Sequence, residues 1–195
     1  MAEQGIYSIF AAMLEYPRED MRGMTRECIK ALEGHPHSPP AAVSDVKAFL
    51  KEISEMPLDD LQGLYSYTFE MGGGEHTLDL GYHLFDGFKR SGNLVTIKTM
   101  YRETAFPFEA VSRGELPDHL PVVLRFLDFI KEKEPDIRKS FREDFVIKAL
   151  EKLNKNFELK QDTRTPYRHL VRAITLVVDK DIKTEDLETK QGFGA

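Results

Sequence analysis

The sequence predicts an all-α protein, built as a single bundle of about seven to eight helices. Apolar residues recur every three or four positions along nearly the whole chain, which is the spacing of one face of an α-helix. Prolines and glycines interrupt these segments and mark where one helix ends and the next begins. No segment alternates convincingly between apolar and polar residues as a half-buried strand does, and no unit repeats at a fixed period.

Four helices are expected ahead of residue 72. The first stops at Pro17, the second ends at Gly34 before a proline-rich loop, and the third follows that loop. Pro57 opens the fourth, with Asp59 and Asp60 in its first turn, where acids favour the helix dipole. The side chains expected to face the core are Ile6, Ile9, Phe10, Met13, Leu14, Met21, Met24, Cys28, Leu32, Val43, Val46, Phe49, Leu50, Ile53, Leu58, Leu61, Leu64, Tyr65 and Thr68.

Four more helices are expected after the glycine run 72–74, which breaks the pattern. The stretch 75–91 fits either short helices or a loop. The fifth helix is kinked or ended by Pro107, and the sixth follows Gly114 with Pro117 in its first turn. The seventh follows Pro135, and the eighth starts near residues 165–166. Their inward stripes contain Leu94, Ile97, Tyr101, Ala105, Phe108, Leu116, Leu120, Val123, Leu124, Leu127, Ile130, Ile137, Phe141, Phe145, Ala149, Leu153, Phe157, Tyr167, Leu170, Val171, Ile174 and Val177.

The chain is expected to form one helical domain over residues 1–180, because 195 residues suit a single domain with a sizeable core. Residues 181–195 are polar and end in small residues, which is typical of a flexible tail. The start of the chain lacks a basic region ahead of an apolar run, and no stretch reaches about 18 apolar residues. We therefore expect neither a secretory signal nor membrane insertion. The single Cys28 excludes an internal disulfide and fits a reducing cytoplasm.

The net charge of −6 is unevenly distributed. Residues 1–135 carry 14 basic and 22 acidic residues, whereas residues 136–190 carry 13 basic and 11 acidic residues. The acidic excess in residues 1–135 disfavours binding to nucleic acid, whose phosphates it would repel, and suits a basic partner. The simpler interpretation, that the excess acid keeps the protein soluble, stays open.

Familiar catalytic and cofactor motifs are missing. His35 and His37 are spaced for chelation but have no nearby cysteine or carboxylate at ligand spacing. The glycine run 72–74 lacks the Lys-Ser/Thr ending of a phosphate loop, and no Gly-x-Ser-x-Gly elbow occurs. Cys28 lies on an apolar stripe and is interpreted as a small core residue. We expect no metal, no cofactor and no catalytic residue.

The sharpest local feature is the segment 115–121, Glu-Leu-Pro-Asp-His-Leu-Pro. Pro117 and Asp118 suit the first turn of a helix. A second proline and a histidine beside two acids exceed what helix initiation needs. Glu115 or Asp118 at the edge of a groove would pair with arginine through charge-assisted hydrogen bonds. Helix start and binding site both remain open on spacing alone.

Aromatic residues form a second feature on either side of the glycine run. They occur on adjacent helix faces, so one helix cannot bury them all. Exposed rings beside acids would suit an apolar peptide with a basic end, and a large aromatic core is the alternative. The residues concerned are Tyr65, Tyr67, Phe69, Tyr82, His83, Phe85 and Phe88.

These segments resemble the nitrate reductase delta-subunit family, the NarJ/TorD-type redox enzyme maturation chaperones. The strongest match is ELPDHLPVVLRFL at 115–127, which is similar to the family's Glu-x-Pro-Asp-His segment. LQGLYSYTFEM at 61–71, GYHLFDGF at 81–88 and FAAMLEYP at 10–17 also resemble family segments, in the same order. The stretch TLDLGYHLFDGFKRSG is closer to the branch serving dimethyl sulfide, selenate and hydrocarbon-oxidising molybdoenzymes, which leaves the client open.

The resemblance implies a TorD-like, all-helical chaperone in the cytoplasm, without catalytic activity. Its partner would be the catalytic subunit of a molybdoenzyme, whose N-terminal, twin-arginine-like segment it holds until cofactor insertion. A monomer is expected, with a helix-exchanged dimer as the family's alternative. The residues implied in client binding are Glu115, Pro117, Asp118, His119, Tyr65, Phe69 and His83.

Two other functions remain as alternatives. The chain would be a stable accessory subunit if it stayed in the finished oxidoreductase. It would be a helical hydrolase if His119 and Asp118 acted together, but adjacent residues on a helix point about 100° apart. We expect instead an apolar groove that takes the client segment, with acids at its edge that bind the client's arginines.

Overall fold

The structure is a computed structural model that describes residues 5–35, 37–71, 74–131, 133–159 and 165–192. Within these residues the protein is all-α, which confirms the predicted fold class. The described residues hold no β-strand, and their one isolated β-bridge joins Asp79 to His119. The stretch 75–91 contains turns, the short helix α5 (Leu80–Leu84) and the start of α6.

The longer helices follow the eight predicted apolar stripes, except that Ala105 and Leu116, both predicted to face the core, are exposed and lie outside the helices. A π-helical turn, Ser66–Glu70, prolongs α4, and another, Arg142–Val146, joins α9 to α10. A second short helix, α7 (Phe108–Ser112), follows α6. The longer helices are α1 (Ile6–Met13), α2 (Met21–Gly34), α3 (Pro40–Ile53), α4 (Leu58–Tyr65), α6 (Gly87–Glu103), α8 (Leu120–Phe129), α9 (Pro135–Phe141), α10 (Ile147–Leu159) and α11 (Tyr167–Gly192).

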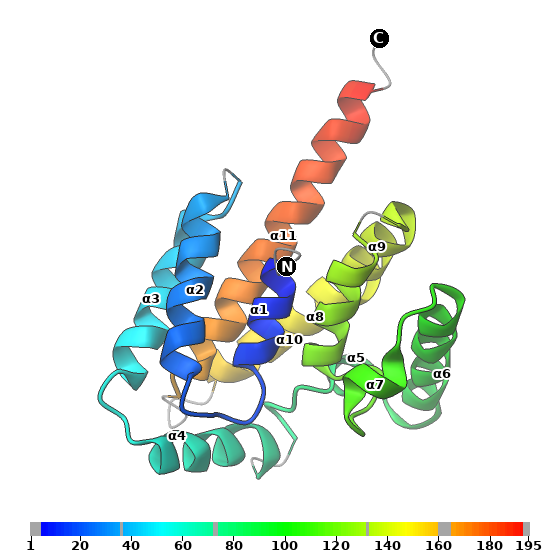
Figure 1. The fold of residues 1–195 in the computed structure, drawn as a ribbon. Coiled ribbons are helices and arrows are strands. Elements are labelled where there is room, and N and C mark those ends of the chain that lie inside the picture. Colours follow the sequence, from blue (N-terminus) through cyan, green and yellow to red (C-terminus); the bar gives the residue numbers. More distant parts are fainter. Residues whose placement is uncertain (1–4, 36, 72–73, 132, 160–164, 193–195) are drawn as a thin grey trace.

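The helices pack around α11, which contacts α3 along one side and α10 along another. Figure 1 shows α2 and α3 on one side of α11, with α8 and α9 on the other. Helix α1 lies against both α2 and α8, so the start of the chain closes the core. The small helices α5 and α7 lie beside α6 at one end of the molecule (Figure 1). The core is formed by the predicted stripes, including Phe10, Phe49, Leu124 and Ile174, each fully buried.

Two helix ends differ from the prediction. Pro117 does not lie in the first turn of the sixth helix, because α8 begins at Leu120 and Pro121 takes that position. Helix α6 ends at Glu103, four residues before Pro107, and Ala105 follows with a φ of 56°. Phe108 therefore belongs to α7 rather than to the fifth stripe, although its ring still packs against Tyr101.

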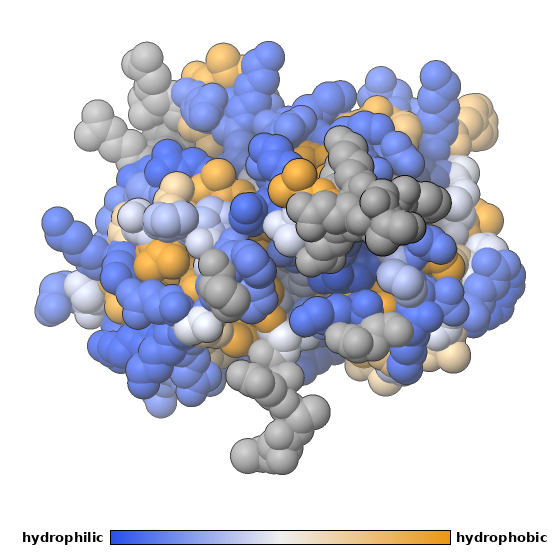
Figure 2. All heavy atoms as spheres, turned by 90° about the horizontal axis from the view of Figure 1, so that it is seen from above, coloured by the Kyte–Doolittle hydropathy of each residue, from blue (hydrophilic) through white to orange (hydrophobic). Residues whose placement is uncertain are grey.

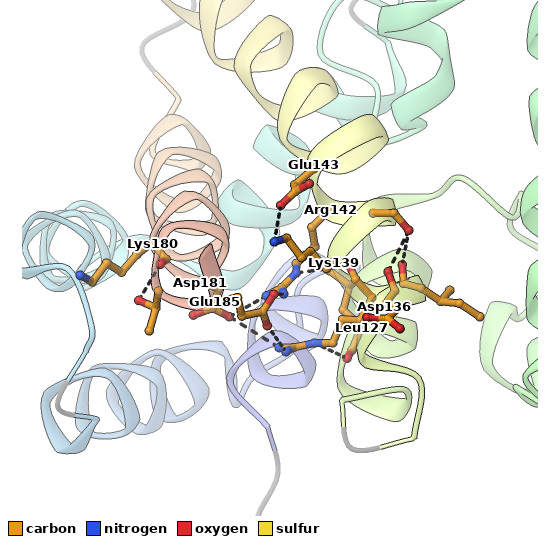
Figure 3. A network of polar contacts seen from close by, with 12 residues as sticks. Leu127, Asp136, Lys139, Arg142, Glu143, Lys180, Asp181 and Glu185 are labelled. Atoms are coloured by element: carbon orange, nitrogen blue, oxygen red, sulfur yellow. Dashed lines mark hydrogen bonds and ion pairs between the residues drawn. The ribbon is translucent and has the colours of Figure 1, made fainter. Parts of the chain in front are cut away.

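The last helix, α11, continues through residues 181–192, where the sequence favoured a flexible tail. Asp181 and Glu185 within that stretch bind the buried Arg142 of the α9–α10 junction (Figure 3). Arg138 contacts the same two carboxylates, at 3.6 and 3.1 Å. These ion pairs hold the polar half of α11 against α9, a long-range effect that composition does not reveal.

The face of the molecule seen in Figure 2 is mainly hydrophilic, and its apolar residues lie in separate spots. Among the described residues, no helix combines the length and the apolar character that crossing a membrane requires.

Candidate functional site

A cavity of about 200 Å³ lies where the end of α1 meets α4 and the start of α8. We call it the Glu115 cavity. It brings together Glu115, His119 and Tyr65, three of the residues predicted to bind a client. Its other lining residues are Glu15, Tyr16, Arg18, Glu70, Val111, Ser112, Arg113, Pro121, Val122 and Arg125.

The segment 115–119 forms a turn that leads into α8. The amide of Glu115 donates to the carbonyl of Ser112 at 3.0 Å, and the amide of His119 donates to Leu116 at 3.1 Å. Pro117 is buried, and its carbonyl accepts a hydrogen bond from the hydroxyl of Tyr101 at 2.7 Å. The turn directs Glu115 outward, with its side chain 58% exposed. This geometry separates the exposed acid of the motif from the buried one.

Asp118 is the buried acid, with 0% of its surface exposed. Its Oδ2 accepts a hydrogen bond from the amide of Gly81 at 2.9 Å, whereas its Oδ1 has no partner among the described residues. Burial, followed by the charge of Asp79, raises the pKa of Asp118 above the ordinary carboxyl value. Asp118 therefore ties α5 to the start of α8 and does not line the cavity.

His119 lines the cavity, and Asp79 holds its imidazole. The Nδ1 atom of His119 lies 3.1 Å from Oδ1 of Asp79 and 3.9 Å from Glu115. The second oxygen of Asp79 accepts a hydrogen bond from Arg90 at 3.1 Å. Burial alone would raise the pKa of Asp79, but the hydrogen bond and charge of His119, together with Arg90, lower it. Asp79 is thus an ionised anchor for the imidazole.

Tyr65 and Phe69 belong to an aromatic cluster behind the cavity. The Tyr65 hydroxyl donates to the carbonyl of Leu14 at 3.0 Å, and its ring meets Tyr16 edge-on at 5.6 Å. Phe69 packs on Tyr65 and on Tyr167, with ring centroids 5.0 Å apart in both pairs, and is 8% exposed. Tyr65 therefore lines the cavity, whereas Phe69 supports it from the core.

His83 lies apart from the cavity lining. Its Nε2 atom contacts the carbonyl of Thr77 at 2.9 Å, and burial lowers the pKa of its imidazole. The structure thus gathers Glu115, His119 and Tyr65, places Pro117, Asp118 and Phe69 beneath them, and leaves His83 in the neighbouring turn.

Three lining residues from the end of α1 onward escaped sequence reasoning. Glu15 binds Arg113 at 3.3 Å and Arg125 at 2.6 Å, so its charge is offset within the cavity. Tyr16 is 49% exposed, and Arg18 lies nearby. Only Tyr16 carried a signal, as an aromatic residue just before Pro17 where the first stripe ends.

An apolar groove of about 640 Å³ lies on the other side of α7. Val95 of α6, Phe106 and Phe108 line it, with Lys98 and Glu109 paired across its rim at 3.3 Å. Each end of α7 lines one of the two sites. Residues 108–110 line the groove, and residues 111–112 line the Glu115 cavity. Among the described residues, no group of three or more acids, histidines or cysteines could hold a metal ion.

Comparison with known proteins gives one family and two curated relatives. The family model described as nitrate reductase delta subunit matches residues 37–177. The chain is 25% identical over 126 residues to the nitrate reductase molybdenum cofactor assembly chaperone NarJ of Escherichia coli strain K12. It is equally similar to the NarJ of E. coli O157:H7. Each match covers 65% of this chain and 52% of the relative, so the chain spans about half the length of these relatives.

Proposed function

Because this chain belongs to the nitrate reductase delta subunit family, we propose that it is an assembly chaperone for a molybdenum-cofactor oxidoreductase. The family consists of assembly chaperones and not of catalytic enzymes. The chaperone acts in the cytoplasm and holds the N-terminal, twin-arginine-like segment of the catalytic subunit. It releases that segment once the cofactor is in place.

One observation carries the choice of site. Glu115 and His119 of the family-like segment line an open cavity together with Tyr65, and neither is buried in the core. Arg113 and Arg125 already bind Glu15, which leaves Glu115 and the exposed Glu70 as the acids available to a ligand. A client guanidinium would bind these carboxylates through charge-assisted hydrogen bonds and would lie against the ring of Tyr65.

The apolar groove beyond α7 takes the part of the client that follows its basic residues. Helix α7 spans five residues, or roughly 7 Å along its axis at 1.5 Å per residue. An extended peptide covers this distance in about two residues. A leader with arginines followed within a few residues by an apolar run thus fits the cavity and groove together.

The remaining predicted residues have indirect roles in this proposal. Pro117, Asp118 and Phe69 are buried and shape the wall that presents Glu115, His119 and Tyr65. His83 lies outside the cavity lining, so a contact with the client there requires a segment that extends past the cavity.

The test measures binding of a synthetic peptide with two adjacent arginines followed by an apolar run. Glu70→Gln combined with Glu115→Gln should weaken binding by about tenfold or more, because the charge-assisted hydrogen bonds to the client's arginines are lost. Glu27→Gln, an exposed acid on α2, is the matched control and should bind as the wild type does. Higher salt should also weaken wild-type binding. Equal affinity of the double variant and the control would refute the site.

The groove is tested by changes at two neighbouring positions of α6. Val95→Glu places a carboxylate in the groove, whereas Thr96→Glu places one at the neighbouring exposed position outside the lining. We expect Val95→Glu to weaken binding of the full peptide and to leave binding of a short diarginine peptide unchanged. If both substitutions had the same effect, the apolar part of the client would lie elsewhere.

The accessory-subunit alternative is decided by purification of the mature oxidoreductase. A chaperone should copurify with the immature catalytic subunit and be absent from the finished, cofactor-loaded complex. Its stable presence in the finished complex would favour the accessory-subunit function.

A further inference from the structure

The short stretch before α5 pairs with the start of α8. The amide of Leu80 donates to the carbonyl of Asp118 at 3.0 Å, and the amide of Leu120 donates to the carbonyl of Leu78 at 2.8 Å. These two bonds form the isolated antiparallel bridge in which Asp79 lies opposite His119. The backbone therefore fixes the Asp79 side chain beside the imidazole.

The Asp79 carboxylate uses one oxygen for His119 and the other for Arg90, each at 3.1 Å. An ionised carboxylate only accepts hydrogen bonds, so Nδ1 of His119 must carry the proton that it donates. In a neutral imidazole the other nitrogen, Nε2, is then an acceptor. Among the described residues no hydrogen bond to Nε2 of His119 is formed, and the imidazole lines the Glu115 cavity.

We propose that Asp79 is a positioning residue that holds the neutral imidazole of His119 in the Nδ1-protonated tautomer, so that in this form Nε2 offers the client a hydrogen-bond acceptor. This inference rests on the proposed function and adds a recognition element to it. An arginine or a backbone amide of the client has the N–H donor that Nε2 requires. Glu115, 3.9 Å from Nδ1, adds a carboxylate on the same wall. The ligand class is therefore a peptide N–H donor at the motif, beside the acids that bind its positive charge.

The tautomer is measured directly by long-range ¹H–¹⁵N NMR of the histidine side chains. At a pH where the imidazole is neutral, Nδ1 of His119 should carry the proton in the wild type and Nε2 should not. Asp79→Ala should abolish this preference, and Asp79→Asn should keep it because the amide oxygen still accepts a hydrogen bond. Asp86→Ala, which removes an exposed carboxylate between α5 and α6, should leave the tautomer unchanged. A wild-type His119 protonated on Nε2 would overturn the proposal without any client.

A double-mutant cycle with the diarginine leader peptide tests the consequence for binding. Asp79→Ala should weaken binding by about tenfold in the wild-type background and have no further effect in the His119→Ala background. An equal loss in both backgrounds would show that Asp79 acts on the client or the fold independently of His119, and would refute its role in positioning His119. Circular dichroism of each variant verifies that it is folded.

The two hypotheses fail in different ways. In one case the tautomers behave as expected but neither the wild type nor any variant binds the peptide. The proposed function is then wrong, and Nε2 of His119 has no role in binding a client. If the wild type binds the peptide and the Asp79→Ala loss persists without His119, the proposed function stands and the positioning inference is wrong.

Discussion

The amide of Gly81 donates a hydrogen bond to the carboxylate of Asp118 at a distance of 2.9 Å, and the two groups leave no room for a side chain between them. A Cβ atom at Gly81 would lie 2.6 Å from Oδ2 of Asp118. This contact fixes the first turn of α5 against the residue that precedes His119. The wall of the Glu115 cavity therefore depends on a glycine 37 positions earlier in the chain.

Gly81→Ala should destabilise the protein, because the added methyl group cannot fit without moving the Asp118 carboxylate or α5. We expect a loss of about 1–3 kcal/mol in the free energy of unfolding, the usual range for overpacking a buried position. Urea unfolding followed by circular dichroism measures it.

Two other helical glycines serve as controls for this substitution. Nothing lies within 4 Å of a Cβ added at Gly63 or Gly92. Alanine there should stabilise by roughly 0.5–1 kcal/mol, since it reduces the entropy of the unfolded chain and favours the helix. If Gly81→Ala also stabilised the protein, the Asp118 carboxylate would have to be mobile.

Asp118→Asn should change the pH dependence of stability. Burial raises the pKa of Asp118, so the folded protein holds this proton more tightly than the unfolded chain does. That contribution is complete in acid and is lost as pH rises through the ordinary carboxyl range and up to the folded-state pKa. Asparagine has no such proton, so the variant should gain stability relative to the wild type as the pH rises from the ordinary carboxyl range, about pH 4, to the folded-state pKa of Asp118.

Urea unfolding at a series of pH values gives this difference. Asp86→Asn, at an exposed position, controls for the general loss of a negative charge. A difference between Asp118→Asn and the wild type that stayed constant with pH would contradict the raised pKa.

Arg142→Met should loosen the polar half of α11. The fully buried guanidinium binds Asp181 at 3.3 Å and also binds Glu185, and methionine keeps its apolar stem but leaves both acids without it (Figure 3). Breaking a buried ion pair costs about 3–5 kcal/mol. We expect the lower end, because the two acid side chains are each 29% exposed and can be hydrated.

Hydrogen exchange locates this effect. Amides around residues 179–185 of α11 should lose protection in Arg142→Met more than amides in α3 do. Lys183→Met removes a surface ion pair with Asp179 on the same helix and should cost less than about 1 kcal/mol. Unchanged protection in α11 would show that the arginine does not anchor this half of the helix.

The helical stripes could be predicted because each depends on local spacing, whereas the start of α8 could not. Pro117 and Pro121 both suit a first helical turn. Two backbone hydrogen bonds, one between Leu120 and Leu78 and one between Leu80 and Asp118, start the helix at the later proline. They join residues about 40 positions apart. The same reason explains the helical stretch 181–192, because Asp181 and Glu185 contact the buried Arg138 and Arg142 only in the packed structure.

The candidate site was predictable in part. The resemblance at 115–119 and the aromatic pattern identified Glu115, His119 and Tyr65, which now line one cavity. Neither could show that Asp118 points inward, because adjacent residues of a turn differ in burial through contacts made elsewhere. Glu15 and Asp79 were missed for the same reason, since they meet the site only through the packing of α1 and the bridge before α5.

Cys28 should resist thiol reagents until the protein unfolds. It is fully buried in α2, and burial raises the pKa of its thiol to about 12. The thiolate is the reactive form, so at pH 8 the thiol is both inaccessible and protonated. Labelling with a disulfide reagent should be at least about 1,000-fold slower in native buffer than in guanidinium chloride, because reaction requires opening of the core.

The chain has one cysteine, so the labelling rate reports the opening of a single site. Ser91→Cys in a Cys28→Ala background places a thiol at an exposed position of α6 and should react at the same rate in native and denaturing buffers. Because α2 packs on α1, and the residues just after α1 line the Glu115 cavity, a bound client peptide should slow the labelling of Cys28 by stabilising the native state. If native Cys28 reacted as fast as the thiol of the Ser91→Cys variant, α2 would have to open independently of the core.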